Sequence, residues 1–287
     1  MRGEVLDKKK KRSVIILLAV LLAASFAGII LTMHTDKHES VKAAMRDAVL
    51  HDINKIDIFG VIQVDPSLFS GFIVTAALLL IAIFIRIFAI PRFKYVPGRF
   101  QMLIEMWVGV FDDLAKTNSP HKNGALGAYL FAVGSYIFTG TMFELFGVQA
   151  ITTGGHSVSL PAPLANINGA IAAGCFSYLF IMIGGLTTNK VAGIGRTLKE
   201  FSLPLSMTFR LFGALLSGML TTELVYYYLT LSFVLPVVVG VLFTVLHALI
   251  QAYVLTMLTS FYYGEVTEPA HPKEKKKKKT ESQPEAA

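Results

Sequence analysis

The residues with the clearest capacity for chemistry are three ionisable side chains inside long apolar stretches. Glu144 is the only Asp, Glu, Lys or Arg between residues 123 and 189, and Glu223 is the only one between 211 and 264. Arg210 stands within "SLPLSMTFRLFGALLSG", with no acid nearby in sequence. An isolated Arg at the centre of a membrane helix costs roughly 3 kcal/mol on insertion scales. Its retention implies a partner, a water-filled cavity or a function in ion movement.

Polar and small residues accompany Arg210 along its predicted helix. With 3.6 residues per turn, Ser217 and Thr221 point within about 20° of the direction of Arg210. Gly213 and Gly218 flank this polar stripe, and small residues allow another helix to approach closely. Arg210 lies too far from either end of its apolar segment for its side chain to reach the headgroups.

The last apolar segment carries a second polar stripe. Thr244, His247 and Gln251 recur at spacings of three and four residues, which places them on one face of a helix. Two such stripes on antiparallel neighbours fit the wall of an aqueous path. The other interpretation is a pair of interhelical hydrogen-bond seams.

Composition places the chain among multi-pass membrane proteins. Hydrophobic residues make up 54% and charged residues 16%, with a mean hydropathy of +0.59, too apolar for a soluble domain. The net charge of +7 is concentrated in basic terminal runs, which fit contact with anionic lipid better than binding to nucleic acid. The single cysteine, Cys175, excludes an internal disulfide, and we expect no cofactor or metal site.

The apolar pattern predicts an all-α helix bundle with six membrane spans, because a span needs about 20 apolar residues. Residues 98–118, apolar with charges at both ends, predict a helix at the membrane interface. The last two spans exceed the required length, which predicts a tilted antiparallel pair. The six predicted spans are 13–33, 71–91, 125–147, 166–188, 201–228 and 233–263.

Lysine and arginine in short loops predict that both termini are cytoplasmic. The apolar run at 13–33 fits either an uncleaved anchor or a secretory signal. The division that follows is a basic cytoplasmic N-terminus at 1–12, that anchor or signal at 13–33, an external segment at 34–70, a membrane domain at 71–264 and a lysine-rich cytoplasmic tail at 265–287.

Five stretches of the sequence resemble motifs of subunit a of the F-type ATP synthase. "PLSMTFRLFGALLSG" and "HALIQAYVLTMLTSFYY" are similar to its arginine helix and its last helix. "VPGRFQMLIE" resembles its P-G-x-x-Q-x-x-x-E, "TMFELFG" its N-x-x-D-x-x-P, and "PLANIN" its P-x-A-D-x-N. The resemblance covers residues 70–264.

The resemblance implies an ion-translocating stator in a bacterial plasma membrane, with no catalytic residue of its own. Arg210 matches the arginine that faces a carboxylate on the rotating ring of c subunits, and Gln251 the glutamine that holds it. Glu144 matches an acid of the outer half-channel, and Asn168 an asparagine of an outer loop, while Asn166 replaces an aspartate. The implied partners are the c-subunit ring, the peripheral stalk subunit b, the soluble catalytic sector and membrane lipid.

The chain departs from the family pattern in the outer proton relay. Ala214 stands where an asparagine is expected and Met219 where an acid or histidine is expected. If Arg210 and Gln251 are level, Ala214 and His247 are level too, so we expect the imidazole of His247 to fill the vacated space as a relay group. A packing role for His247 stays open, as do ion relay and structural hydrogen bonding for Glu223.

Other functions are less well supported by the sequence. A proton-coupled secondary transporter would also keep charges at membrane depth, but the two halves of the chain show no internal repeat. A membrane enzyme is disfavoured because the sequence has no HExxH motif and no phosphate-binding loop. The sequence leaves H⁺ and Na⁺ open as the transported ion, and we favour H⁺.

Overall fold

The computed structural model describes residues 19–20, 23, 56–58, 62–151, 157–227 and 235–269. Apart from residues 19–20 and 23, the predicted span at 13–33 lies outside the described residues. The basic N-terminus and the tail beyond residue 269 also lie outside them.

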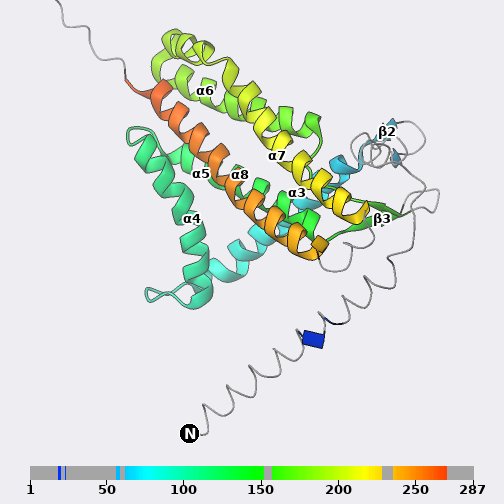
Figure 1. The fold of residues 1–287 in the computed structure, drawn as a ribbon. Helices are drawn as coiled ribbons and strands as arrows, with labels where there is room; N and C mark the ends of the chain where they lie inside the picture. The colour runs from blue at the N-terminus through cyan, green and yellow to red at the C-terminus, as the bar shows by residue number, and fades with distance from the viewer. Residues whose placement is uncertain are drawn as a thin grey trace, which may run out of the picture.

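The described chain is an all-α bundle, as the sequence predicts, with two short antiparallel hairpins (Figure 1). The hairpins pair β1 (Ile56–Ile58) with β2 (Ile62–Val64) and β3 (Gln149–Ile151) with β4 (Ser157–Ser159). The long helices are α3 (Pro66–Phe84), α4 (Arg99–Asn118), α5 (Gly124–Leu145), α6 (Ile167–Lys199), α7 (Ser202–Tyr227) and α8 (Leu235–Thr267). A π-turn, η1 (Ile85–Ala89), and a 3-10 turn, η2 (Ile90–Arg92), continue α3.

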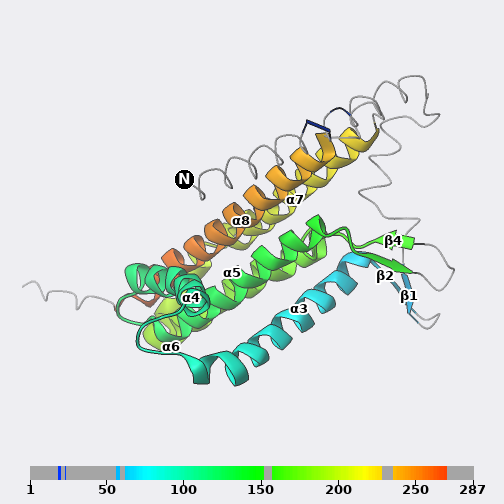
Figure 2. The ribbon, with the colours of Figure 1, turned by 90° about the horizontal axis from the view of Figure 1, so that it is seen from below.

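The core of the bundle lies where α5 and α6 pack against α7 and α8 (Figure 2). Glycines let neighbouring helices of the bundle lie close together. A side chain of the neighbouring helix occupies the space that a Cβ at the glycine would need. The ring of Phe111 in α4 fills that space at Gly134 of α5, and the ring of Tyr263 in α8 fills it at Gly184 of α6. α3 packs mainly on α5 and leaves most of its apolar surface exposed.

Four described helices are long and apolar enough to cross a membrane, namely Pro66–Arg92, Gly124–Leu145, Ile167–Lys199 and Gly240–Thr267. The segment predicted as the fifth span forms α7, which is not among the four; several side chains in the second half of α7 lie outside the described residues. Both views place α7 alongside α8 (Figures 1 and 2). At 1.5 Å per residue the 33 residues of α8 extend about 50 Å, longer than the roughly 30 Å of hydrocarbon.

Two helices extend five residues or more beyond the rough bounds of the predicted spans. The span predicted to begin at residue 71 begins at Pro66, since a proline suits the first helical position and Asp65 precedes it in extended conformation. The span predicted to end at residue 188 continues to Lys199 across a break at Lys190, where φ is 52°. The interfacial segment predicted at 98–118 forms α4, with its bounds within one residue.

Candidate functional site

Arg210 lies on an exposed face of α7 and makes no hydrogen bond or ion pair with any residue that the structure describes. The hydroxyls on the same face are satisfied within their own helix. Ser217 Oγ donates to the carbonyl of Ala214 at 2.8 Å, and Thr221 Oγ1 donates to that of Ser217 at 2.7 Å. These two residues therefore do not form the interhelical seam that was the other interpretation of the stripe.

The surface beside Arg210 is open to a neighbour. A Cβ built at Gly213, three residues after Arg210, meets no atom within 4 Å. Ser206, one turn before Arg210, is also exposed. A Cβ built at Gly218 also meets no atom within 4 Å, so the close approach of another helix at Gly213 and Gly218 stays a prediction.

Gln251 lies in α8, next to α7, and its side chain is buried at 6% exposure. Its Oε1 atom is buried and has no hydrogen-bond partner among the described residues. A buried acceptor without a donor costs about 1–3 kcal/mol. The structure records no bond between Gln251 and Arg210, so an orphaned acceptor and an unpaired donor lie on neighbouring helices of the described chain.

A small pocket between α5, α7 and α8 brings together residues that are far apart in the sequence. Glu144 comes from the last turn of α5, Ala214 from α7 and His247 from α8. Ala214 and His247 therefore share one pocket. The remaining lining residues are Thr141, Leu215, Gly218, Phe243 and Thr244.

The orientation of His247 is set by its own helix. Nδ1 lies 2.9 Å from the carbonyl oxygen of Phe243, and the two rings stack with centroids 5.6 Å apart. A carbonyl can only accept, so Nδ1 carries the proton and Nε2 of the neutral imidazole is left as an acceptor. His247 can thus take a proton at Nε2 without losing the bond that holds its ring.

The local sequence explains why Glu144 reaches this pocket. Gly147 adopts a φ of 56°, and its N–H bonds to the carbonyl of Glu144 at 3.1 Å, which ends α5 immediately after the acid. Glu144 is half-buried, and its carboxylate has no hydrogen-bond donor within the described part of the chain.

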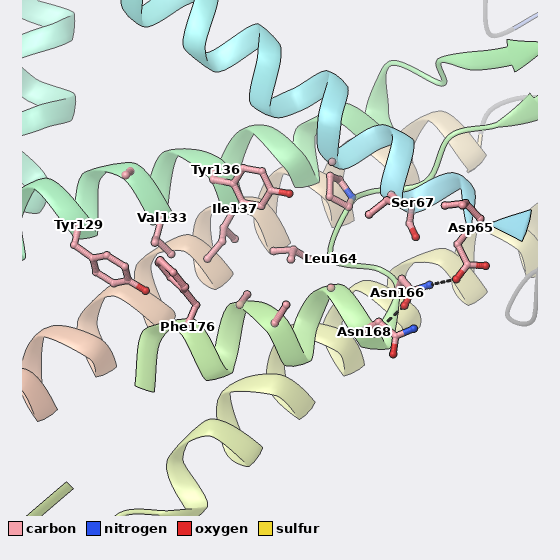
Figure 3. Close-up of a pocket in the computed structure, with 18 residues that line it drawn as sticks. Asp65, Ser67, Tyr129, Val133, Tyr136, Ile137, Leu164, Asn166, Asn168 and Phe176 are labelled. Carbon is pink, nitrogen blue, oxygen red and sulfur yellow. Dashed lines mark hydrogen bonds between the residues drawn. The ribbon is translucent and has the colours of Figure 1, made fainter. Parts of the chain in front are cut away.

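Asn168 lies apart from this pocket, in the first turn of α6. It lines a cavity of about 680 Å³ between α3, α5 and α6 (Figure 3). Asn166 bridges two residues at the cavity mouth, because its Nδ2 donates to Asp65 Oδ2 at 2.6 Å and its Oδ1 accepts from the N–H of Asn168 at 2.8 Å. Figure 3 shows these residues at one end of the cavity and Tyr129 and Phe176 at the other.

Asp65 is a residue that the sequence reasoning missed. The available signal was an acid directly before a proline at a helix start, which indicates a helix N-terminus but not a contact with Asn166, 101 residues later. Glu223 lies in α7, but its side chain lies outside what the structure describes. In the described segments no group of three or more His, Cys, Asp or Glu residues is placed to hold a metal ion.

Comparison with known proteins gives one consistent result. The family described as ATP synthase A chain matches residues 70–264, about two thirds of the chain. ATP synthase subunit a of Cereibacter sphaeroides is 24% identical over 192 residues, covering 63% of this chain and 74% of that protein. ATP synthase subunit a of Histophilus somni is 26% identical over 207 residues, covering 58% of this chain and 76% of that protein.

Proposed function

Since this chain belongs to the ATP synthase A chain family, a multi-pass membrane subunit of that complex, we propose that Arg210 is the cation beside which the transported ion binds to and leaves its carrier. The proposal rests on one observation. Arg210 is exposed on a predominantly apolar helix and has no counter-ion among the described residues. A charge of this kind needs an acid from another chain, and the proposed partner is a carboxylate on a ring of c subunits.

The electrostatics suit this role. At about 4 Å and an effective dielectric of about 20, a guanidinium and a carboxylate attract by about 4 kcal/mol. That attraction favours the ionised acid and so promotes release of its proton. A fixed cation also opposes direct passage of protons, so each ion travels with the ring between an inner and an outer half-channel. Each charge that crosses gains ~2.3 kcal/mol per 100 mV.

The outer half-channel is proposed to pass through the small pocket at Glu144 and His247. Both residues can exchange protons, and the accepting Nε2 of His247 suits a relay. Ala214 and His247 line the same pocket, and the imidazole is proposed to serve in place of the asparagine of the family pattern. Glu223 and Asn168 are proposed as further polar groups on the outer side.

Gln251 is proposed to hold Arg210 when the ring carboxylate is not in contact. Its orphaned Oε1 can accept from the guanidinium after a rotation of either side chain, which removes the cost of the buried acceptor. Gly213 is proposed to let the ring approach α7 closely, since nothing in the described chain occupies its open side.

The further partners are proposed to be the peripheral stalk subunit b and the soluble catalytic sector. The catalytic sector is needed because this sequence has no nucleotide-binding motif. The transported ion is proposed to be H⁺, and both termini are proposed to be cytoplasmic in a bacterial plasma membrane. The N-terminal segment at 13–33 is proposed to be an anchor.

Reconstitution of the complex and of the isolated chain separates a motor subunit from a proton-coupled transporter. The whole complex in liposomes is expected to acidify the lumen when ATP is added, as reported by a pH-sensitive dye. The isolated chain is expected to give neither ATP-driven acidification nor proton-coupled solute uptake. Solute uptake by the isolated chain would support the transporter and contradict the proposal.

A further inference from the structure

A second charged site lies at the far end of α3, away from Arg210. An open cavity of about 500 Å³ is lined by the end of α3, η1 and η2, the connection at 93–98 and the first turn of α4. Figure 2 shows the chain turning back there to enter α4. Three cations line the cavity, namely Arg92, Lys94 and Arg99, and four phenylalanines line it with them, namely Phe84, Phe88, Phe93 and Phe100.

Side-chain hydrogen bonds hold the connection against α4. The side-chain amide of Gln101 makes a two-way bond with the backbone of Lys94: Oε1 accepts from its N–H at 3.0 Å, and Nε2 donates to its carbonyl at 2.9 Å. Nε2 also donates to Glu105 Oε1 at 2.7 Å. Gln101 and Glu105 are two of the four fixed positions of the motif P-G-x-x-Q-x-x-x-E, so this motif shapes the basic cavity.

The aromatic side of the cavity continues the exposed apolar surface of α3. The rings of Phe84 and Phe88 lie 5.1 Å apart and are 58% and 48% exposed. The preceding turns of α3 expose leucine and isoleucine in the same way. The cations therefore stand where an apolar span ends, which is the depth at which phospholipid phosphates lie.

We propose that this cavity binds an anionic phospholipid. Its phosphate contacts the cations Arg92, Lys94 and Arg99, and its acyl chains lie along Phe84 and Phe88. The charge pattern favours an anionic headgroup because the lining contributes three positive charges and no acid, Glu105 lying outside the cavity with its Oε1 bonded to Gln101. The exposed aromatic surface favours a lipid over a free phosphate ion, which has no apolar part to bury.

Photolabelling of the purified whole complex tests this proposal. The probe is phosphatidylglycerol with a diazirine on its acyl chain, titrated into phosphatidylcholine nanodiscs, and the readout is half-maximal labelling of the peptide spanning residues 84–101. Each cation near an anionic headgroup contributes about fivefold in affinity, so Arg92→Gln, Lys94→Gln and Arg99→Gln together are expected to weaken labelling roughly a hundredfold.

Matched controls separate a built site from general attraction between charges. Replacing the lysines at 275–277 with glutamine removes the same charge elsewhere and is expected to change labelling less than about twofold. Exchanging arginine for lysine and lysine for arginine at the three cavity positions keeps the charge and is expected to keep labelling.

Three outcomes would overturn the proposal. Equal labelling by a diazirine phosphatidylcholine would mean that the cations do not select the lipid. Full competition by inorganic phosphate would assign the cavity to a free anion. Cross-linking of residues 84–101 to another protein chain, with no lipid adduct, would assign this surface to a protein partner.

Discussion

Arg210→Ala is expected to abolish ATP-driven proton pumping by the assembled complex while ATP hydrolysis continues. Removing the guanidinium removes an attraction of about 4 kcal/mol for the ring carboxylate, which corresponds to roughly a thousandfold in the acid's ionisation equilibrium. The barrier to direct proton passage is lost with the same charge. Pumping should therefore fall below detection, and a membrane potential should drive a passive proton leak through liposomes that contain the variant.

Two variants control for the loss of a cation from a membrane helix. Arg86 is exposed in the continuation of α3, and Arg86→Ala is expected to leave pumping within about twofold of the parent. Arg210→Lys keeps the charge but not the planar, multiply donating guanidinium, and is expected to be strongly impaired without the passive leak. Normal pumping by Arg210→Ala would remove the basis of the proposed mechanism.

Glu144→Gln is expected to have the second largest effect, lowering pumping by roughly a hundredfold. The substitution keeps the size of the side chain and removes its ability to release and take up a proton, and a positioned proton-transfer group contributes at least about that factor. Asp113→Asn, in the exposed part of α4, is the matched control and should pump normally. Unimpaired pumping by Glu144→Gln would place the outer path elsewhere.

His247→Phe reports on the same pocket. Phenylalanine can keep the stacking on Phe243 but offers no Nε2 acceptor, so pumping should fall if the imidazole relays protons. His247→Gln keeps a polar group without imidazole titration and should fall as well. If the complex with His247→Phe pumps normally, and only substitutions that disturb the packing more lower pumping, His247 is a packing residue.

Much of the helical framework followed from the length of apolar runs and the charges that bound them. α4, α5 and α7 begin and end within two residues of their predicted bounds. Run length failed at the start of α3, where Pro66 begins the helix before the purely apolar residues, and at Lys190, where a local break in φ leaves the long α6 as two helical pieces. Neither feature changes average hydropathy, so a search for apolar windows does not detect it.

If Arg210 and Gln251 are level on antiparallel helices, Ala214 and His247 are predicted to be level as well. The structure places Ala214 and His247 in one pocket. It could not predict that Asn168 lines a different cavity, because that depends on which side of α5 the start of α6 packs. The bond from Asn166 to Asp65 and the bond from Gln101 to Lys94 were also missed, since each depends on the path of an irregular connection.

The most direct test asks what lies opposite Arg210 in the assembled complex. Ser206 lies one turn before Arg210 on the same exposed face of α7, while Leu205 is 56% exposed about 140° around the helix from Arg210. Cysteine at either position, in a Cys175→Ser background because Cys175 is exposed, accepts a benzophenone maleimide. The adducts formed on illumination can then be identified by mass spectrometry.

We expect the probe at position 206 to attach to a separate membrane chain with a carboxylate inside its apolar span, and the probe at position 205 to attach to it far less. Attachment at position 206 only to lipid or to this same chain would rule out the proposed role of Arg210, because Arg210 would then have no neighbouring acid to face.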